Sequence, residues 1–262
     1  MPEVTSGGIR ISYEVTGQGR PLVLLHGWLN DRTWWGETGY VDDLRRDHRV
    51  VSVDLRGHGR SDKPHEPGAY HAESFARDVL AVADAEGFQR FAMWGLSYGG
   101  WVAWMTADAA PNRVPALITT GAWDPRPTTY TPGVTPPDPD LEVLQVQGMA
   151  ALIERYEDDE YRFPAAIRAV MLRADPEAML ACQSNELLAD GIRDLESFPV
   201  PTLLIAGQRE DEGGEAASVA RMLPHGTSLT LAGLGHAAAC AASSETLPIA
   251  RAFLDRWYGE LT

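Results

Sequence analysis

The chain has 262 residues, a length typical of one large α/β domain. With 44% hydrophobic and 23% charged residues, its composition is that of a globular protein and excludes disorder as the main state. Its 37 acidic and 22 basic residues give a formal charge of −15, which should repel phosphate backbones and anionic lipid. We therefore expect neither a nucleic-acid partner nor a membrane-surface role.

The first 124 residues alternate strand and helix patterns. Alternating apolar positions predict a half-buried strand, and short continuous apolar runs predict strands buried on both faces. The strand patterns cover, in chain order, residues 9–15, 21–25, 50–53, 91–94 and 114–123. Apolar residues at helical spacing predict helices over residues 72–86 and 100–110.

The pattern changes after residue 124. Residues 125–139 contain six prolines, which interrupt regular structure, and helical spacing follows up to residue 195. The alternation of strand and helix then returns for the rest of the chain. The three predicted helices cover residues 151–163, 164–174 and 176–192, and the later strands and helices cover 200–207, 215–223, 227–233 and 244–260.

Alternating strands and helices predict an α/β fold with a mainly parallel, doubly wound sheet. We expect a core formed by residues 1–124 and 196–262, with a small helical cap, residues 125–195, inserted after the sixth strand. Such a cap would lie over the carboxyl ends of the strands, where ligands bind in open α/β sheets.

No targeting or metal-binding pattern is visible. The N-terminus lacks the basic start and apolar stretch of a secretory signal, and no apolar run approaches the roughly 18–20 residues that span a bilayer. Cys182 and Cys240 are too few for a disulfide framework and too far apart for a zinc site. We expect a cytoplasmic protein without a metal.

Residues 95–99 read Gly-Leu-Ser-Tyr-Gly and match the pattern G-x-S-x-G between a strand and a helix. A sharp strand-to-helix turn exposes the central Ser97 hydroxyl above the sheet, and small residues on both sides avoid clashes. The helix N-terminus directs free N–H groups toward an anion that forms beside this serine. Ser97 is therefore the candidate nucleophile.

A serine hydroxyl needs a base within hydrogen-bond reach. His236 follows the last predicted strand and precedes the last helix. It also lies downstream of Ser97, and where a G-x-S-x-G serine is part of a catalytic triad the chain order is Ser…acid…His. A carboxylate should orient the imidazole. Three residues that follow strands are candidates for this acid: Glu210, Asp211 and Asp124.

An oxyanion hole needs two N–H groups directed at the developing negative charge. We expect one from Tyr98, the residue after the nucleophile, and one from Trp28 in the loop after the strand at 21–25. His26, in the same loop, is expected to support the loop structurally. Trp28, Trp35 and Trp123 are candidates for lining an apolar substrate pocket.

Several segments in order resemble the α/β-hydrolase superfamily, and the resemblance covers nearly the whole chain. They are the oxyanion loop LVLLHGW, the turn RGHGRSDKP, the elbow WGLSYGGWVAW, the strand VPTLLIAGQRE with its acid, and the loop LAGLGHAAA with its histidine. In this family the acid commonly stands three residues after a glycine as G-x-x-D, which implies that Glu210 takes this place with Glu for Asp. Asp211 is the alternative, and Asp124 ranks third.

The resemblance also separates branches of the family. Haloalkane dehalogenases and epoxide hydrolases use an aspartate nucleophile, whereas this chain has Ser97. Cofactor-free dioxygenases of the same fold place an aspartate at the end of the sixth strand, where this chain has Gly121.

Our hypothesis is a serine hydrolase that cleaves a small carboxylic ester or lactone without a cofactor. The alternatives are a cofactor-free dioxygenase acting on a heteroaromatic substrate and a non-enzymatic small-molecule receptor. Residues 125–195 hold 13 acidic and 6 basic residues, nearly half of the net charge of −15. We therefore expect an apolar or aromatic substrate that is not strongly anionic.

Overall fold

A computed structural model describes residues 1–121, 124–127, 138–157, 161–184 and 190–258. Its centre is one eight-stranded sheet with the strand order β1-β2-β4-β3-β5-β6-β7-β8. Strand β2 pairs antiparallel with β1 and β4, whereas the pairings from β4 through β3 to β8 are all parallel. The strands are β1 (Glu3–Ser6), β2 (Ile9–Thr16), β3 (Arg20–Leu25), β4 (His48–Val53), β5 (Ala92–Leu96), β6 (Leu117–Thr120), β7 (Thr202–Gly207) and β8 (Gly226–Leu231).

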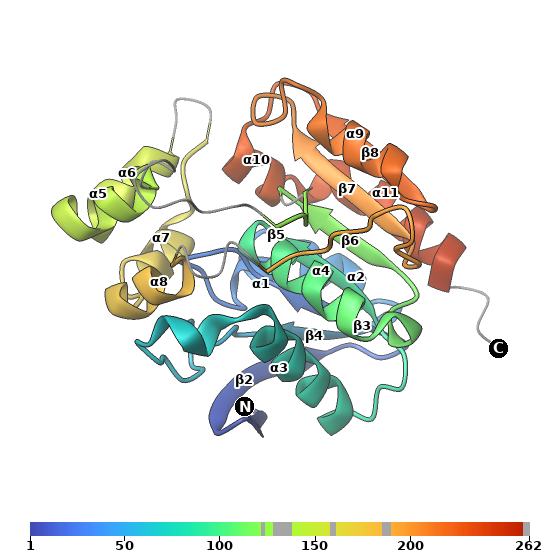
Figure 1. Cartoon of the computed structure of the whole chain (residues 1–262), viewed down its shortest axis with the longest axis horizontal. Coiled ribbons are helices and arrows are strands. Elements are labelled where there is room, and N and C mark those ends of the chain that lie inside the picture. Colours follow the sequence, from blue (N-terminus) through green and yellow to red (C-terminus); the bar gives the residue numbers. More distant parts are fainter. Residues whose placement is uncertain (122–123, 128–137, 158–160, 185–189, 259–262) are drawn as a thin grey trace.

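Helices cover both faces of this sheet: α3 and α4 lie in front of it, and α2 and α11 lie behind it (Figure 1). The core helices are α1 (Trp34–Glu37), α2 (Tyr40–Leu44), α3 (Ala72–Ala85), α4 (Tyr98–Ala109), α9 (Glu215–Met222), α10 (His236–Ala241) and α11 (Ser243–Tyr258), with 3₁₀ turns η1 (Pro67–Tyr70) and η2 (Pro111–Arg113). No helix in the described ranges is both long and apolar enough to cross a lipid bilayer.

The central strands are buried because helices cover the sheet on both sides. All residues of β5, β6 and β7 are buried, which explains their continuous apolar sequence runs. Parallel strands end at the same edge of a sheet. The loops after β3, β5, β6, β7 and β8 therefore meet there, and they carry Gly27, Ser97, Gly121, Glu210 and His236.

The predicted α/β fold with a mainly parallel sheet is confirmed, and most predicted elements are found within a few residues of their expected bounds. The strand predicted over residues 114–123 is shorter, and Pro115 has no N–H to donate to a ladder. The sequence pattern did not predict β1, α1, α2 or α10, which have four, four, five and six residues and are too short for a clear periodicity.

Four helices lie between β6 and β7 in the part of the chain that the structure describes: α5 (Pro139–Gln147), α6 (Met149–Tyr156), α7 (Ala165–Met171) and α8 (Pro176–Cys182). Three were expected. The additional helix, α5, begins at an Asp138 N-cap that accepts a hydrogen bond from Asp140 N, and Gly148, with φ of 84°, separates it from α6.

Figure 1 shows α5 and α6 side by side and away from the sheet, with α7 and α8 nearer to it. These four helices all fall within residues 125–195. The division into a core of residues 1–124 and 196–262 and a cap of residues 125–195 stays our proposal, and "cap" denotes those residues below.

A buried ion pair fixes the loop after β4 to helix α3. Arg56 donates from Nε and Nη2 to the two carboxylate oxygens of Asp78, both at 2.7 Å, and the two side chains are 4% and 3% exposed. A bidentate pair of this kind satisfies both charges. Removal of one partner would leave the other charged and buried.

We predict that Asp78→Ala lowers the free energy of unfolding by about 3–5 kcal/mol, because it strands the Arg56 guanidinium in the interior. Urea denaturation measures the change. The matched control is Asp84→Ala on the same helix, whose carboxylate is 65% exposed and pairs with Arg113. That variant should lose less than about 1 kcal/mol. Equal losses in the two variants would contradict the role assigned to Arg56.

Candidate active site

Ser97 occupies the sharp turn between β5 and α4. Its φ of 49° and ψ of −118° lie outside the regions that side chains prefer. Within the described ranges, Leu29 is the other non-glycine residue with a positive φ, and it belongs to the loop after β3. Backbone strain of this kind clusters at functional sites.

Two glycines make this turn possible. A Cβ on Gly95 would lie 2.3 Å from the Gly99 carbonyl oxygen, and a Cβ on Gly99 would lie 2.3 Å from the carbonyl oxygen of Leu25. Both distances are far below van der Waals contact. The turn therefore packs directly on the backbone at the end of β3, which explains the small residues of the G-x-S-x-G pattern.

The structure brings Ser97, His236 and Glu210 into one hydrogen-bonded chain. Ser97 Oγ lies 2.9 Å from His236 Nε2, and His236 Nδ1 is hydrogen-bonded to Glu210 Oε2. The other oxygen, Glu210 Oε1, accepts from Gly207 N at 2.7 Å. Because the carboxylate can only accept from Nδ1–H, Nε2 is left free to accept the serine proton.

The other two candidate acids lie elsewhere. Asp211 is buried and accepts hydrogen bonds from the N–H groups of Glu215 and Ala216 at the start of α9. Asp124 forms an ion pair with Arg126 at 2.7 Å. Of the three carboxylates that the sequence left open, the structure places only Glu210 against His236.

Gly121, at the end of β6, provides the space for the His236 ring. A Cβ at this position would lie 2.6 Å from Cε1 and 2.9 Å from Nδ1 of that ring, and φ is 68°. Any side chain at residue 121, an aspartate included, would therefore force the imidazole to move. From the sequence, Gly121 was notable only because it stands where cofactor-free dioxygenases of this fold have an aspartate.

The loop after β3 is held by the fully buried His26. Burial lowers the pKa of this imidazole, so it is neutral. Leu55 N donates to Nε2 at 3.1 Å, and Nδ1 therefore carries the proton and donates to the Gly27 carbonyl at 2.8 Å. In a trans peptide the N–H points opposite to the C=O, so the Trp28 N–H is directed away from His26.

Two backbone N–H groups are available next to the nucleophile. Trp28 N follows the oriented Gly27 carbonyl, and Tyr98 N lies in the first turn of α4, where helical N–H groups have no partner in the helix. In the described part of the chain, neither group donates to a protein acceptor. Their role as an oxyanion hole stays a prediction.

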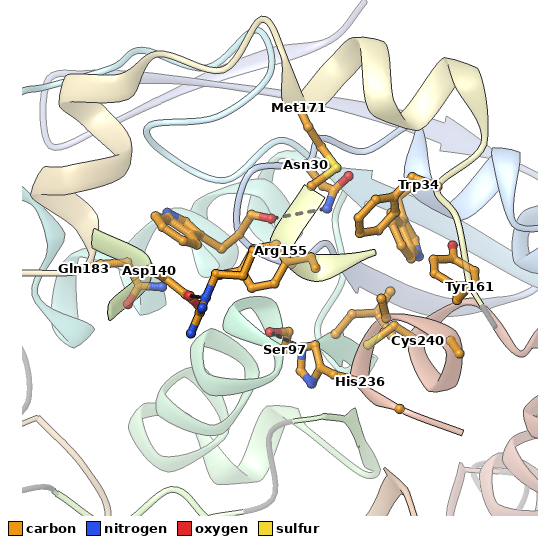
Figure 2. A pocket seen from close by; sticks show the side chains of 18 of the residues that line it. Asn30, Trp34, Ser97, Asp140, Arg155, Tyr161, Met171, Gln183, His236 and Cys240 are labelled. Atoms are coloured by element: carbon orange, nitrogen blue, oxygen red, sulfur yellow. Dashed lines mark hydrogen bonds and ion pairs between the residues drawn. The ribbon is translucent and has the colours of Figure 1, made fainter. Parts of the chain in front are cut away.

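Ser97 and His236 open into a cavity of about 480 Å³. Core loops and cap helices line it together. Its described lining includes Trp28, Asn30, Trp34, Asp140, Arg155, Tyr156, Tyr161, Phe163, Met171, Gln183 and Cys240. In Figure 2 the polar side chains of Asp140, Arg155 and Gln183 lie on one side of Ser97, and Trp34, Tyr161 and Cys240 lie on the other.

The pocket prediction is partly wrong. Trp28 lines the cavity, but Trp35 does not: its ring is fully buried and packs edge-on against Tyr40 and Trp94, with ring centroids 5.2 and 5.9 Å apart. The neighbouring Trp34 lines the cavity instead. Trp123 lies outside the described residues.

A mainly parallel sheet with a strained serine between β5 and α4 defines the α/β-hydrolase class of protein. The family model for the alpha/beta hydrolase fold matches residues 20–156, more than half of the chain. The chain therefore belongs to the α/β-hydrolase fold family.

Similar proteins carry different names. Epoxide hydrolase 4 of Mus musculus is 30% identical over 49% of this chain and 35% of its own length, so the chain spans about a third of that relative. A 2-hydroxymuconate semialdehyde hydrolase of Pseudomonas sp. is 28% identical over 88% of this chain and 81% of its own. The solved structure of esterase RhEst1 from Rhodococcus sp. is 25% identical, covers 98% of both chains and has a TM-score of 0.73.

The geometry can support nucleophilic chemistry at Ser97, because His236 and Glu210 are in hydrogen-bond contact with each other and His236 is in contact with Ser97. In the parts of the chain with described positions, no group of three or more His, Cys, Asp or Glu residues could hold a metal ion. Four polar residues of the cavity could not be predicted from the sequence, since no short motif marks them: Asn30, Asp140, Arg155 and Gln183.

We predict that Gly121→Ala displaces His236 and slows labelling of Ser97 by a fluorophosphonate about 100-fold, because a shift near 1 Å is enough for such a loss. The labelling rate is measured by mass spectrometry. Gly87→Ala is the matched control: Gly87 also has a positive φ, 72°, but an added Cβ meets nothing within 4 Å. An unchanged rate in Gly121→Ala would refute the steric argument.

Proposed function

We propose that this chain is a serine hydrolase that cleaves a small carboxylic ester or lactone through an acyl-enzyme on Ser97. The observation that carries the proposal is the hydrogen-bonded chain in which Ser97 Oγ lies 2.9 Å from His236 Nε2 and His236 Nδ1 contacts Glu210. This arrangement has the order and contacts of a nucleophile, a general base and an orienting acid.

In the first half of the reaction, Ser97 Oγ attacks the substrate carbonyl while its proton passes to His236 Nε2. The N–H groups of Trp28 and Tyr98 stabilise the oxyanion of the tetrahedral intermediate. Glu210 stabilises the imidazolium that forms. The intermediate then expels the alcohol, which takes the proton from His236, and the acyl group stays on Ser97 as an ester.

In the second half, a water molecule attacks the acyl-enzyme with His236 again as general base. The tetrahedral intermediate forms a second time and collapses with the Ser97 oxygen as leaving group. His236 returns the proton to that oxygen, and the carboxylic acid is released. No step needs a metal or an organic cofactor.

A serine nucleophile favours some of the activities that the relatives' names suggest over others. Attack of Ser97 on an epoxide carbon would form an ether on the protein, and water does not cleave an ether under these conditions. A carboxylate nucleophile instead forms an ester that water can cleave. Ser97 therefore favours acyl chemistry over the epoxide opening named for one group of relatives.

The expected substrate is a small molecule that is apolar or aromatic and not strongly anionic. Trp28, Trp34, Phe163 and Met171 supply apolar lining to the cavity. The excess of acidic residues over residues 125–195 disfavours polyanions near its entrance. We further propose a cytoplasmic location and no nucleic-acid or membrane partner.

We predict that Ser97→Ala abolishes turnover of a short p-nitrophenyl ester, with at least a 10³-fold loss of kcat, because the acyl-enzyme can no longer form. Release of p-nitrophenol measures the rate. Undiminished turnover would refute the proposal. Oxygen consumption with a hydroxyquinolone-type substrate that is insensitive to Ser97→Ala would indicate a dioxygenase instead, and saturable binding without turnover would indicate a receptor.

We predict that Glu210→Gln lowers kcat by about 10²–10⁴, because the imidazole loses the acceptor that fixes its tautomer and stabilises its charge. Asp211→Asn should keep kcat within about threefold, since Asp211 contacts backbone N–H groups of α9 and an asparagine oxygen can accept the same bonds. Steady-state kinetics of the two variants measures the difference. The reverse result would make Asp211 the orienting acid.

A further inference from the structure

Three polar residues of the cap form a hydrogen-bonded cluster near the proposed nucleophile. Asp140 stands at the start of α5, and Arg155 and Tyr156 stand at the end of α6. Arg155 Nε and the Tyr156 hydroxyl donate to the two oxygens of Asp140, each at 2.6 Å. All three residues line the cavity that contains Ser97 and His236.

This cluster has hydrogen-bonding capacity left for a ligand. Arg155 uses Nε for Asp140, and its two terminal amino groups have no acceptor among the residues with described positions. Its side chain is 49% exposed and the side chain of Asp140 is 25% exposed. Gln183, on the same side of the cavity, adds an amide that can both donate and accept.

The charge of this side does not favour an anion. Asp140 balances the guanidinium of Arg155, and Asp138, which also lines the cavity, adds a further negative charge. A substrate carboxylate would approach a side of the cavity with a net charge of about −1. A neutral group that accepts from Arg155 and donates to a carboxylate or to Gln183 fits better.

The opposite side of the cavity is mainly aromatic. Trp34 packs edge-on against Phe163 with ring centroids 6.1 Å apart, and Phe163 packs in the same way against Tyr161 at 5.4 Å. Met171 also lines the cavity. In Figure 2 Ser97 lies between the polar side chains of Asp140, Arg155 and Gln183 and the aromatic side chains of Trp34 and Tyr161.

We infer that the Arg155–Asp140 pair is a specificity-determining subsite for a neutral amide or hydroxyl group of the substrate, with an aromatic or aliphatic group bound on the Trp34–Phe163 side. The inference rests on the proposed function and narrows its substrate class to amphiphilic esters and lactones. The polar group belongs either to the acyl part or to the alcohol part of the ester.

Two matched pairs of esters distinguish these sources. In the first pair the acyl part varies: p-nitrophenyl N-propanoylglycinate and p-nitrophenyl hexanoate have acyl chains of the same length, with and without an amide. In the second pair the alcohol part varies: the hexanoates of 4-(acetamidomethyl)phenol and 4-butylphenol. The kcat/KM ratio of the amide-bearing ester to its alkyl partner cancels general effects on the reaction.

Arg155→Gln should lower this ratio about tenfold for one of the two pairs, because a charged hydrogen-bond donor to the amide is lost. Arg173→Gln is the matched control: Arg173 is an exposed cap arginine that does not line the cavity, and its variant should keep both ratios. Ratios that stay unchanged for both pairs in Arg155→Gln would overturn the subsite. The proposed function would still stand if Ser97→Ala abolished hydrolysis of all four esters.

Asp140→Asn gives a readout that a purely structural role would not produce. It removes the charge that balances Arg155, so the kcat/KM for the mono-p-nitrophenyl ester of adipic acid should rise at least about threefold relative to p-nitrophenyl hexanoate at low ionic strength. High salt should remove the effect. No change in this ratio would show that Arg155 does not face the substrate and would overturn the inference.

Discussion

The close contact between the turn at Ser97 and the end of β3 determines the geometry of the whole site. Gly99 lies so near the Leu25 carbonyl that no side chain fits between the two backbones. This contact places Ser97, the proposed nucleophile, beside Gly27 and Trp28, which come from the loop after a different strand. The close approach of these two backbone segments thus sets the position of Ser97 Oγ relative to the two N–H groups that we expect to bind the oxyanion.

The position of His236, the proposed base, depends on a missing side chain as well as on hydrogen bonds. His236 contacts Ser97 and Glu210, but its ring can lie there only because Gly121 has no side chain. Glu210 in turn is fixed by the Gly207 N–H. Loops after three successive strands therefore cooperate to orient one imidazole.

The cap contributes the side chains that distinguish this cavity from a general α/β-hydrolase site. The core supplies the proposed nucleophile, base and N–H groups, whereas Arg155, Asp140 and Phe163 come from the cap and line the same cavity. The net charge of −15 indicates what the protein repels at long range. The ion pair between Arg155 and Asp140 acts over a hydrogen-bond distance, where direction and pairing matter more than net charge.

The sequence by itself determined the fold, the order of most strands and helices, and the candidacy of Ser97 and His236. These follow from local patterns: apolar periodicity, and a serine between two glycines at a strand-to-helix turn. Only the tertiary structure shows which of two residues adjacent in the sequence contacts the site. Glu210 turns toward His236 while Asp211 turns toward α9.

In the same way, Trp34 faces the cavity while Trp35 is buried in the core, because successive residues of a helix point about 100° apart. The pairing of Asp140 with Arg155 likewise depends on how α5 and α6 pack together. Adjacent residues share nearly all of their sequence context, and their different surroundings arise only when distant segments fold against one of them.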